Sequence, residues 1–227
     1  MKNAVLWIIT ALSMIITAAV INAVPDRIPM HYDFQGNVDR YGSKYELFIY
    51  PCLMLVMAVM WMLLLRYFRK KIDSEDEKAA AEAKTNIKVI YISSVVMMLM
   101  QLGFQIGSIV TAVKSVENPA NPMPDSIISW IIAVLGITMM VVGNLMPKTK
   151  RNGYFGLRTV WSVKNDKIWF ESNRFAGVSF FICGAFMTAA ALMLDGMIVV
   201  NSTMVVLILV SVASVVYSYI MYKKYKD

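Results

Sequence analysis

Six long apolar blocks constrain the fold of this chain more than any other feature. Each block approaches or exceeds the roughly 20 residues that an α-helix needs to cross a bilayer. The blocks cover residues 4–24, 47–65, 87–113, 127–146, 176–194 and 197–222. Apolar residues make up 58% of the chain and charged residues only 16%, against about 25% charged residues in soluble domains. These values exclude a soluble enzyme, a secreted domain and a disordered chain, and they predict an all-α transmembrane, six-helix polytopic bundle.

The basic residues are distributed unequally over the two sides of such a bundle. Six spans place 18 of the 22 Lys and Arg residues on the side of both termini and 4 on the other side. Because cytoplasmic loops are enriched in Lys and Arg, we expect a multi-pass protein with both termini in the cytoplasm. The net charge of +7 then reflects topology and attraction to the lipid bilayer, and we expect no direct binding of nucleic acid.

Polar segments between the blocks predict the domain organisation. An extracellular loop at residues 25–46 joins the two spans of an N-terminal unit, residues 1–70. A cytoplasmic linker follows at residues 71–86. A four-span module covers residues 87–227 and contains a cytoplasmic loop at residues 147–174.

The linker has the composition of a solvated helix. Ser74 and Glu77 have the spacing of a capping box, and the alanines at residues 79–81 favour helix. We therefore expect the linker to extend the third span as a helix and to contain no functional site.

Polar residues inside the spans are few. Gln101 and Gln105 share one face of the third span, beside Gly103 and Gly107, which form a G-x-x-x-G pattern. We interpret this face as a close helix–helix contact with amide cross-links. A polar lining for a peptide or ion path is the alternative. The sequence has no ionisable residue at mid-span and no catalytic constellation, so we do not expect an enzyme.

The extracellular loop shows the alternation of a half-buried strand. Every second residue from Ile28 to Phe34 is apolar. Residues 35–37 form a turn signal, and residues 38–44 return the chain. We predict a small hairpin-like loop with its apolar side against the end of the bundle.

His31, the only histidine of the chain, lies near Asp33 and Asp39 in this loop. These side chains could hold a metal ion, but a zinc or calcium site would lack ligands. We favour the interpretation in which the three side chains tie the loop together by hydrogen bonds, and we predict no metal site and no cofactor.

The cytoplasmic loop is rich in basic and aromatic residues. Arg158 and Trp161 are suited to the lipid headgroup layer. Ser162 or Asn165 can cap a short helix through residues 164–173, which we expect to lie at the membrane interface. The alternative is a docking surface for a cytoplasmic partner.

Both loops resemble parts of one known family. The extracellular loop resembles the N-terminal domain of unknown function found in SdpI-type proteins, through Pro29, His31, Asp33, Gly36, Asp39, Gly42, Ser43 and Lys44. The cytoplasmic loop resembles the SdpI module, through Asn152, Gly156, Arg158, Thr159, Trp161, Trp169, Asn173 and Arg174. Val160 and Ser162 depart from the family, which often has Pro and Thr at these positions.

The resemblance implies an integral membrane immunity protein in the cell membrane of Gram-positive bacteria. Such proteins protect the cell against a secreted toxic peptide, and some also recruit a cytoplasmic transcriptional repressor to the membrane as a signal. The resemblance makes the extracellular residues candidates for toxin binding and the cytoplasmic residues candidates for signalling. A small membrane transporter or a non-immunity membrane scaffold is the alternative function.

Overall fold

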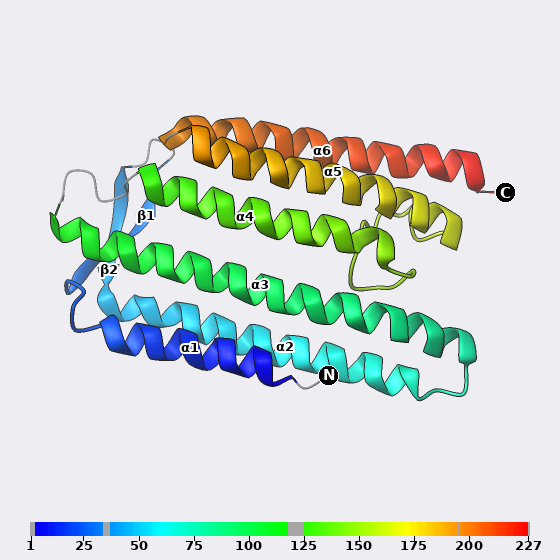
Figure 1. Cartoon of the computed structure of the whole chain (residues 1–227), viewed down its shortest axis with the longest axis horizontal. Helices are drawn as coiled ribbons and strands as arrows, with labels where there is room; N and C mark the ends of the chain where they lie inside the picture. Colours follow the sequence, from blue (N-terminus) through cyan, green and yellow to red (C-terminus); the bar gives the residue numbers. More distant parts are fainter. Residues whose placement is uncertain (1–2, 34–36, 118–124, 195, 227) are drawn as a thin grey trace.

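The computed structural model describes residues 3–33, 37–117, 125–194 and 196–226, and Figure 1 shows their arrangement. The helices of this part of the chain are α1 (Ala4–Val20), α2 (Ile49–Ile72), α3 (Glu77–Glu117), α4 (Asp125–Leu145), α5 (Asp166–Met193) and α6 (Gly196–Tyr225). Strands β1 (Arg27–Tyr32) and β2 (Val38–Ser43) form an antiparallel hairpin. Short 3-10 helices precede α2 (η1, Lys44–Phe48) and follow α4 (η2, Met146–Lys148).

Five of the described helices, α2 to α6, are long and apolar enough to cross a membrane. Helix α1 is also apolar but has 17 residues, at the short end of the roughly 17–25 residues of transmembrane helices. Helix α3 has 41 residues because the linker extends it, as the sequence predicts. The prediction of a mostly helical, polytopic membrane protein with a small hairpin is confirmed.

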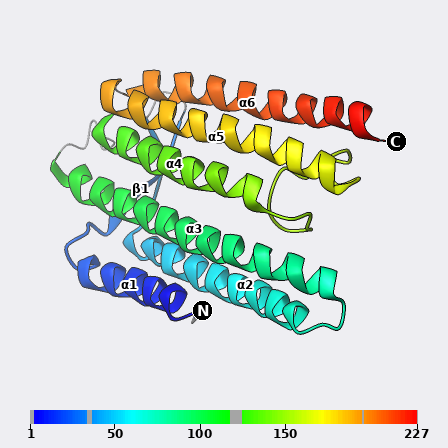
Figure 2. The ribbon, with the colours of Figure 1, turned by 45° about the vertical axis from the view of Figure 1, so that its right-hand side comes forward.

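The helices alternate in direction and form two groups of three (Figures 1 and 2). Helices α1, α2 and α3 contact one another, as do α4, α5 and α6, and the contact between α3 and α4 joins the groups. The β-hairpin lies at one end of the bundle, which we call the hairpin end (Figure 1). The segment of residues 149–165 lies at the opposite end, which we call the loop end.

A buried amide connects α1 to α3. The Nε2 of Gln105, a fully buried residue, donates to the carbonyl oxygen of Ser13 at 2.9 Å and to Oγ1 of Thr17 at 2.8 Å. Its Oε1 accepts a hydrogen bond from Oγ of Ser13 at 2.5 Å. The predicted amide cross-link is therefore present at Gln105.

Glycines bring α4 and α5 into backbone contact. A Cβ on Gly136 would lie 2.7 Å from the carbonyl oxygen of Gly184, and one on Gly143 would lie 2.6 Å from that of Gly177. A Cβ on Gly107, in the G-x-x-x-G pattern of α3, would lie 3.6 Å from the nearest side chain of α4. The closest glycine-mediated contact is thus between α4 and α5 rather than at the G-x-x-x-G face.

The cap of α3 differs from the prediction. Oδ1 of Asp76 accepts a hydrogen bond from the backbone N–H of Ala79 at 3.0 Å. The hydroxyl of Ser74 instead donates to the carbonyl oxygen of Asp76 at 3.5 Å. Because the helix begins at Glu77, that residue stands too early to be the third helical position that a capping box requires.

The prediction of a separate interfacial helix at residues 164–173 is wrong, because these residues are not a helix of their own. Asn165 does cap a helix, since its Oδ1 accepts from the backbone N–H of Ile168 at 2.8 Å. That helix is α5 itself, which runs without interruption from Asp166 to Met193. No proline or turn signal follows Asn173, so the helix continues into the span, and Ile168 and Trp169 are buried in the bundle.

Candidate functional site

The hairpin is anchored to the bundle by its apolar side. Ile28 of β1 and Leu47 of η1 are fully buried and pack with Ile109 and Ala112 of α3. The pairing of β1 with β2 is irregular between Pro29 and the end of β1. The predicted hairpin with an inward apolar face is therefore confirmed for the described residues of the loop, which end at Asp33 and resume at Asn37.

The polar residues of the hairpin form two separate pairs. Nδ1 of His31 lies 2.6 Å from Oδ1 of Asp39. The carboxylate of Asp33 accepts hydrogen bonds from the backbone N–H of Asn37 at 2.8 Å and from its Nδ2 at 3.0 Å. Within the described part of the chain, no three His, Cys, Asp or Glu side chains gather as a metal site would require. Gly36 lies outside the described residues.

The Gly42-Ser43-Lys44 segment joins the hairpin to α2. Ser43 caps η1, and its backbone N–H donates to Oε1 of Glu46 at 3.0 Å, which completes a capping box. Nζ of Lys44 forms an ion pair with Oδ1 of Asp26 at 2.9 Å. The hydrogen bond from Lys44, and then its charge, hold the pKa of Asp26 below its ordinary value, and the same bond raises the pKa of Lys44.

A cavity of about 330 Å³ lies between the hairpin and the helices. Its lining comes from β1, α2, α3 and α4, and includes Pro29, Tyr32, Tyr50, Phe104, Thr111 and Ile131. A second cavity of about 190 Å³ lies between Tyr32, α4 and α6. Tyr32 and Ile131 line both cavities, so the ring of Tyr32 stands between the two groups of helices.

The hydroxyl of Tyr32 is buried and has no hydrogen-bond partner among the described residues. Burial, followed by the nearby Tyr41 and Tyr50, raises the pKa of Tyr32 to about 12. Sequence alternation placed Tyr32 on the apolar face of the hairpin, but nothing in the sequence indicates that its hydroxyl lacks a partner. A buried polar atom without a partner is costly and marks a place where a ligand group or water can be accepted.

The loop end is organised around Asn173. This residue is fully buried on α5, where its Oδ1 accepts from the backbone N–H of Leu157 at 2.7 Å and its Nδ2 donates to the carbonyl oxygen of Trp169 at 3.0 Å. Nε1 of Trp169 donates to the carbonyl oxygen of Thr149 at 3.0 Å. Gly156 has a φ of +114° and packs so closely on Asn173 that no Cβ would fit.

Asn152 folds the first part of the loop. Its Oδ1 accepts from the backbone N–H groups of Tyr154 and Phe155, both at 2.8 Å. Its Nδ2 donates to the carbonyl oxygen of Lys150 at 2.8 Å. The ring of Tyr154 packs against Phe68 of α2, with ring centroids 5.6 Å apart. The loop therefore contacts both groups of helices.

The second part of the loop is tied to α6. The backbone N–H groups of Thr159 and Ser162 each donate to the hydroxyl of the other residue at 2.9 Å. The Oγ1 of Thr159 also lies 2.8 Å from the Oγ of Ser218, and the ring of Trp161 packs on Tyr219 with centroids 5.0 Å apart. Ser162, which departs from the family pattern, still closes this turn because Ser and Thr both present a hydroxyl.

Eight residues of the second loop carry its family resemblance, and six of them meet in one connected structure at the loop end: Asn152, Gly156, Thr159, Trp161, Trp169 and Asn173. Arg158 and Arg174 are exposed instead. Sequence reasoning missed Arg151, whose Nε forms an ion pair with Oδ1 of Asp166 at 3.1 Å. The 15-residue separation of this pair has no local sequence signal.

Comparisons with known proteins agree with this two-ended layout. Residues 8–55 match the Domain of unknown function (DUF1648), and residues 148–222 match the SdpI/YfhL protein family. The protein named Immunity protein SdpI, from Bacillus subtilis (strain 168), is 25% identical over 225 residues, which cover 98% of this chain and 97% of the relative. No solved structure matches the chain. The first matched segment contains the hairpin and the second contains most of the loop end, so the chain carries a DUF1648 domain at its N-terminal side and a segment of the SdpI/YfhL protein family at its C-terminal side.

Proposed function

We propose that this protein is an immunity protein that protects a bacterial cell against a secreted toxic peptide. The observation that carries the proposal is the match over 98% of the chain to a relative named Immunity protein SdpI. In this proposal the protein lies in the cell membrane with the hairpin end outside and both termini in the cytoplasm. The excess of Lys and Arg at the loop end supports that orientation.

We propose that the peptide binds at the hairpin end. The cavity of about 330 Å³ offers an apolar space for a side chain of the peptide, and the hydroxyl of Tyr32 offers a hydrogen bond. The segments assigned to the outside carry seven acidic and four basic residues. This charge favours a cationic, amphipathic peptide. Pro29, His31, Asp33, Gly36, Asp39, Gly42, Ser43 and Lys44 then shape and hold the binding hairpin.

The proposal keeps the division into an N-terminal two-span unit (1–70), a cytoplasmic linker (71–86) and a four-span module (87–227). The module would pass the signal of a bound peptide to a cytoplasmic transcriptional repressor. Arg158 and the neighbouring Val160, which is 69% exposed, support a docking role for this face. Asn152, Gly156, Thr159, Trp161, Trp169, Asn173 and Arg174 would hold that face in shape.

Protection can be tested in a strain from which the gene of this protein is deleted. We expect the deletion to lower the inhibitory concentration of at least one peptide in a panel of secreted antibacterial peptides, and wild-type protein to restore it. Tyr32→Phe should restore it only in part. Tyr41→Phe is the matched control, because it removes a hydroxyl from the exposed face of the same hairpin. Unchanged sensitivity across the panel, together with substrate flux in proteoliposomes, would favour the transporter.

Recruitment can be tested by co-purification of the full-length protein with cytoplasmic proteins from peptide-treated cells. We expect a DNA-binding repressor to be recovered with the wild-type protein and lost with Arg158→Ala. Lys226→Ala, an exposed change at the same end of the bundle, should leave recovery unchanged. Equal recovery with both variants would remove Arg158 from the docking surface.

A further inference from the structure

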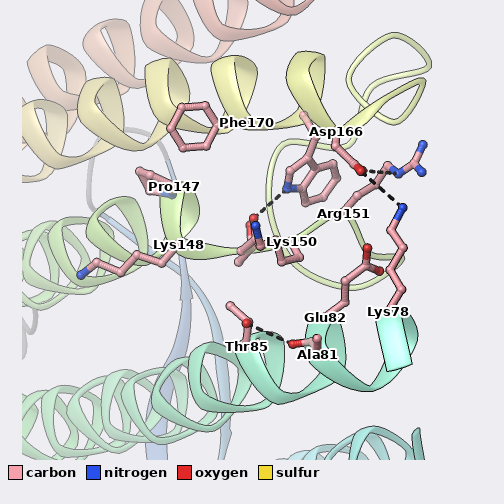
Figure 3. A pocket seen from close by; sticks show the side chains of 12 residues that line it. Lys78, Ala81, Glu82, Thr85, Pro147, Lys148, Lys150, Arg151, Asp166 and Phe170 are labelled. Carbon is pink, nitrogen blue, oxygen red and sulfur yellow. Dashed lines mark hydrogen bonds and ion pairs between the residues drawn. The ribbon is translucent and has the colours of Figure 1, made fainter. Parts of the chain in front are cut away.

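A polar cavity of about 420 Å³ lies at the loop end (Figure 3). It is bounded by the first turns of α3, by the segment of residues 147–151, and by the start of α5. These three segments come from both groups of helices. The family resemblance assigns no role to this cavity, and it is distinct from the cavities at the hairpin end.

The lining of the cavity is positively charged. Four basic residues and two acidic residues contribute to it: Lys78, Lys148, Lys150, Arg151, Glu82 and Asp166. Asp166 is engaged by the cavity's own cations, since its carboxylate lies 3.1 Å from Nε of Arg151 and 3.9 Å from Nζ of Lys78. The excess of positive charge is therefore available to an anionic ligand.

Two adjacent cations line the cavity with donors that are not used. The guanidinium of Arg151 is held in place, because its Nη1 donates to the carbonyl oxygens of Val163 and Lys164 at 3.1 and 3.0 Å. The backbone of Lys150 is fixed beside it by a hydrogen bond from its N–H to Oδ1 of the buried Asn86 at 2.9 Å, while its side chain is exposed. Among the described residues, neither Nη2 of Arg151 nor Nζ of Lys150 has a partner. A fixed guanidinium next to an exposed ammonium suits the oxygen atoms of a phosphate.

Apolar side chains contribute to the other side of the cavity. Figure 3 shows Phe170 and Pro147, together with Lys148, away from the group formed by Lys78, Arg151 and Asp166. Phe170 is 43% exposed, whereas Trp169 is buried and its indole is bonded to Thr149. A ligand that fills the cavity would thus meet a cluster of charges on one side, and hydrocarbon together with Lys148 on the other.

The position of the cavity along the helices matches the lipid headgroup layer. On α3 the lining residues run from Lys78 to Thr85, just before the apolar block at residues 87–113. At 1.5 Å rise per residue, Thr85 lies about 3 Å and Lys78 about 14 Å from the start of that block. On α4 the apolar block ends at residue 146, and Lys148 follows two residues later. Since the headgroup region is roughly 5–8 Å thick on each side of a bilayer, the inner part of the cavity lies at the depth of the lipid phosphates and Lys78 extends beyond it.

We infer that this cavity is a binding site for an anionic phospholipid, whose phosphate contacts Lys150 and Arg151 while its acyl chains pass over Phe170. Basic pockets between transmembrane helices are the usual receptors of such headgroups. The bound lipid bridges α3 to α5 at the loop end, two helices that the protein itself joins there mainly through residues 147–151. This inference does not depend on the immunity function.

The test uses the purified full-length protein in detergent, titrated with phosphatidylglycerol and followed by native mass spectrometry. We expect one phosphatidylglycerol to bind with clear preference over phosphatidylcholine. Lys150→Gln should weaken that binding about fivefold, the effect of one cation near an anionic headgroup. Lys84→Gln is the matched control, because Lys84 is exposed on α3 beside the cavity but does not line it.

Sodium phosphate, as a second ligand, distinguishes binding of a lipid from binding of free phosphate. Phe170→Ala should weaken binding of phosphatidylglycerol, whereas sodium phosphate alone should not raise the thermal unfolding midpoint of the wild-type protein or of this variant. Equal effects of Lys150→Gln and Lys84→Gln, equal binding of the two lipids, or protection by phosphate alone would each overturn the lipid site. If Lys150→Gln does not yield monodisperse protein, Lys78→Gln replaces it, with the same loss of binding expected.

Discussion

The two ends of this bundle are built on different principles, although both carry residues that resemble the family. At the loop end, the amides of Asn152 and Asn173 and the hydroxyls of Thr159 and Ser162 all bond to other parts of the protein. At the hairpin end, the contacts of His31 with Asp39 and of Arg40 with Glu46 lie near the surface, and the buried hydroxyl of Tyr32 has no partner among the described residues. The loop end is a fixed frame, whereas the hairpin end leaves space and an unused polar group.

The largest expected difference between the ends concerns two asparagines. Asn173→Ala should lower the free energy of unfolding by about 2–3 kcal/mol, because it leaves the backbone N–H of Leu157 unpaired inside the protein. Asn37→Ala, at the hairpin end, should change it by less than about 0.5 kcal/mol, because Asn37 is exposed. Denaturant unfolding in detergent measures both. Equal losses would contradict the contrast between a fixed and an open end.

Substitutions of one glycine at each end compare the rigidity of the loop end with that of the hairpin end. Gly156→Ala should cost about 2 kcal/mol, because its φ of +114° disfavours a Cβ and Asn173 occupies the space. Gly42→Ala should cost less, because the atoms near its Cβ belong to the movable side chains of Glu46 and Met30. The midpoints of thermal unfolding test the order. A larger loss for Gly42→Ala would show that the hairpin is the more rigid of the two ends.

Substitution of Tyr32 tests whether the hairpin end contains a buried hydroxyl without a hydrogen-bond partner. Tyr32→Phe should raise the free energy of unfolding by about 1 kcal/mol, since it removes a buried hydroxyl without a partner and no protein hydrogen bond is lost. The pKa of Tyr32 is raised to about 12, so the folded state keeps its proton where the unfolded chain loses it. The contribution of this pKa difference to the free energy of unfolding is complete below pH 10 and is lost as the pH rises toward 12. The difference in ultraviolet absorbance titration between wild type and Tyr32→Phe measures this pKa. A titration near 10 would mean that the hydroxyl is exposed to water.

The smallest effect is expected at the pair formed by the exposed Asp26 and the partly buried Lys44. The pKa of Asp26 is lowered by Lys44, so its contribution to stability is present above its ordinary value of 3.8 and is lost as the pH falls through the lowered pKa. The pKa of Lys44 is raised, so its contribution is present below 10.5 and is lost at higher pH. Asp26→Asn should lower the unfolding temperature slightly and evenly between pH 5 and 9, and by progressively less as the pH falls below 3.8. A difference that does not shrink with falling pH would point to packing rather than charge.

Local sequence patterns correctly predicted most of the helices and the first strand. The lengths of the apolar blocks indicated the helices, and the alternation from Ile28 to Phe34 indicated β1. Asn165 was one of two proposed caps and is the residue that caps α5. The errors were also local. The capping box predicted at Ser74 and Glu77 is absent, because the helix begins at Glu77 and Asp76 caps it. The helix predicted to end at Asn173 is the first part of α5, because nothing after that residue interrupts the helix.

The partners of the polar residues could not be predicted. The hydrogen bond between Ser13 and Gln105 joins residues 92 positions apart, and the ion pair of Arg151 and Asp166 depends on how the loop returns to α5. The cavity beside Tyr32 likewise exists only because β1 is held against α3 and α4. Each of these features requires segments far apart in the sequence to be placed together.

The sequence by itself determined the class of this protein, its membrane helices and its hairpin, because hydropathy and alternation act over a few neighbouring residues. The tertiary structure decided which buried amides are satisfied, that the hydroxyl of Tyr32 is left without a partner among the described residues, and that Lys150 and Arg151 line a cavity beside Phe170. The physical reason is that burial and hydrogen bonding depend on the three-dimensional neighbours of a side chain, and packing of distant helices selects those neighbours.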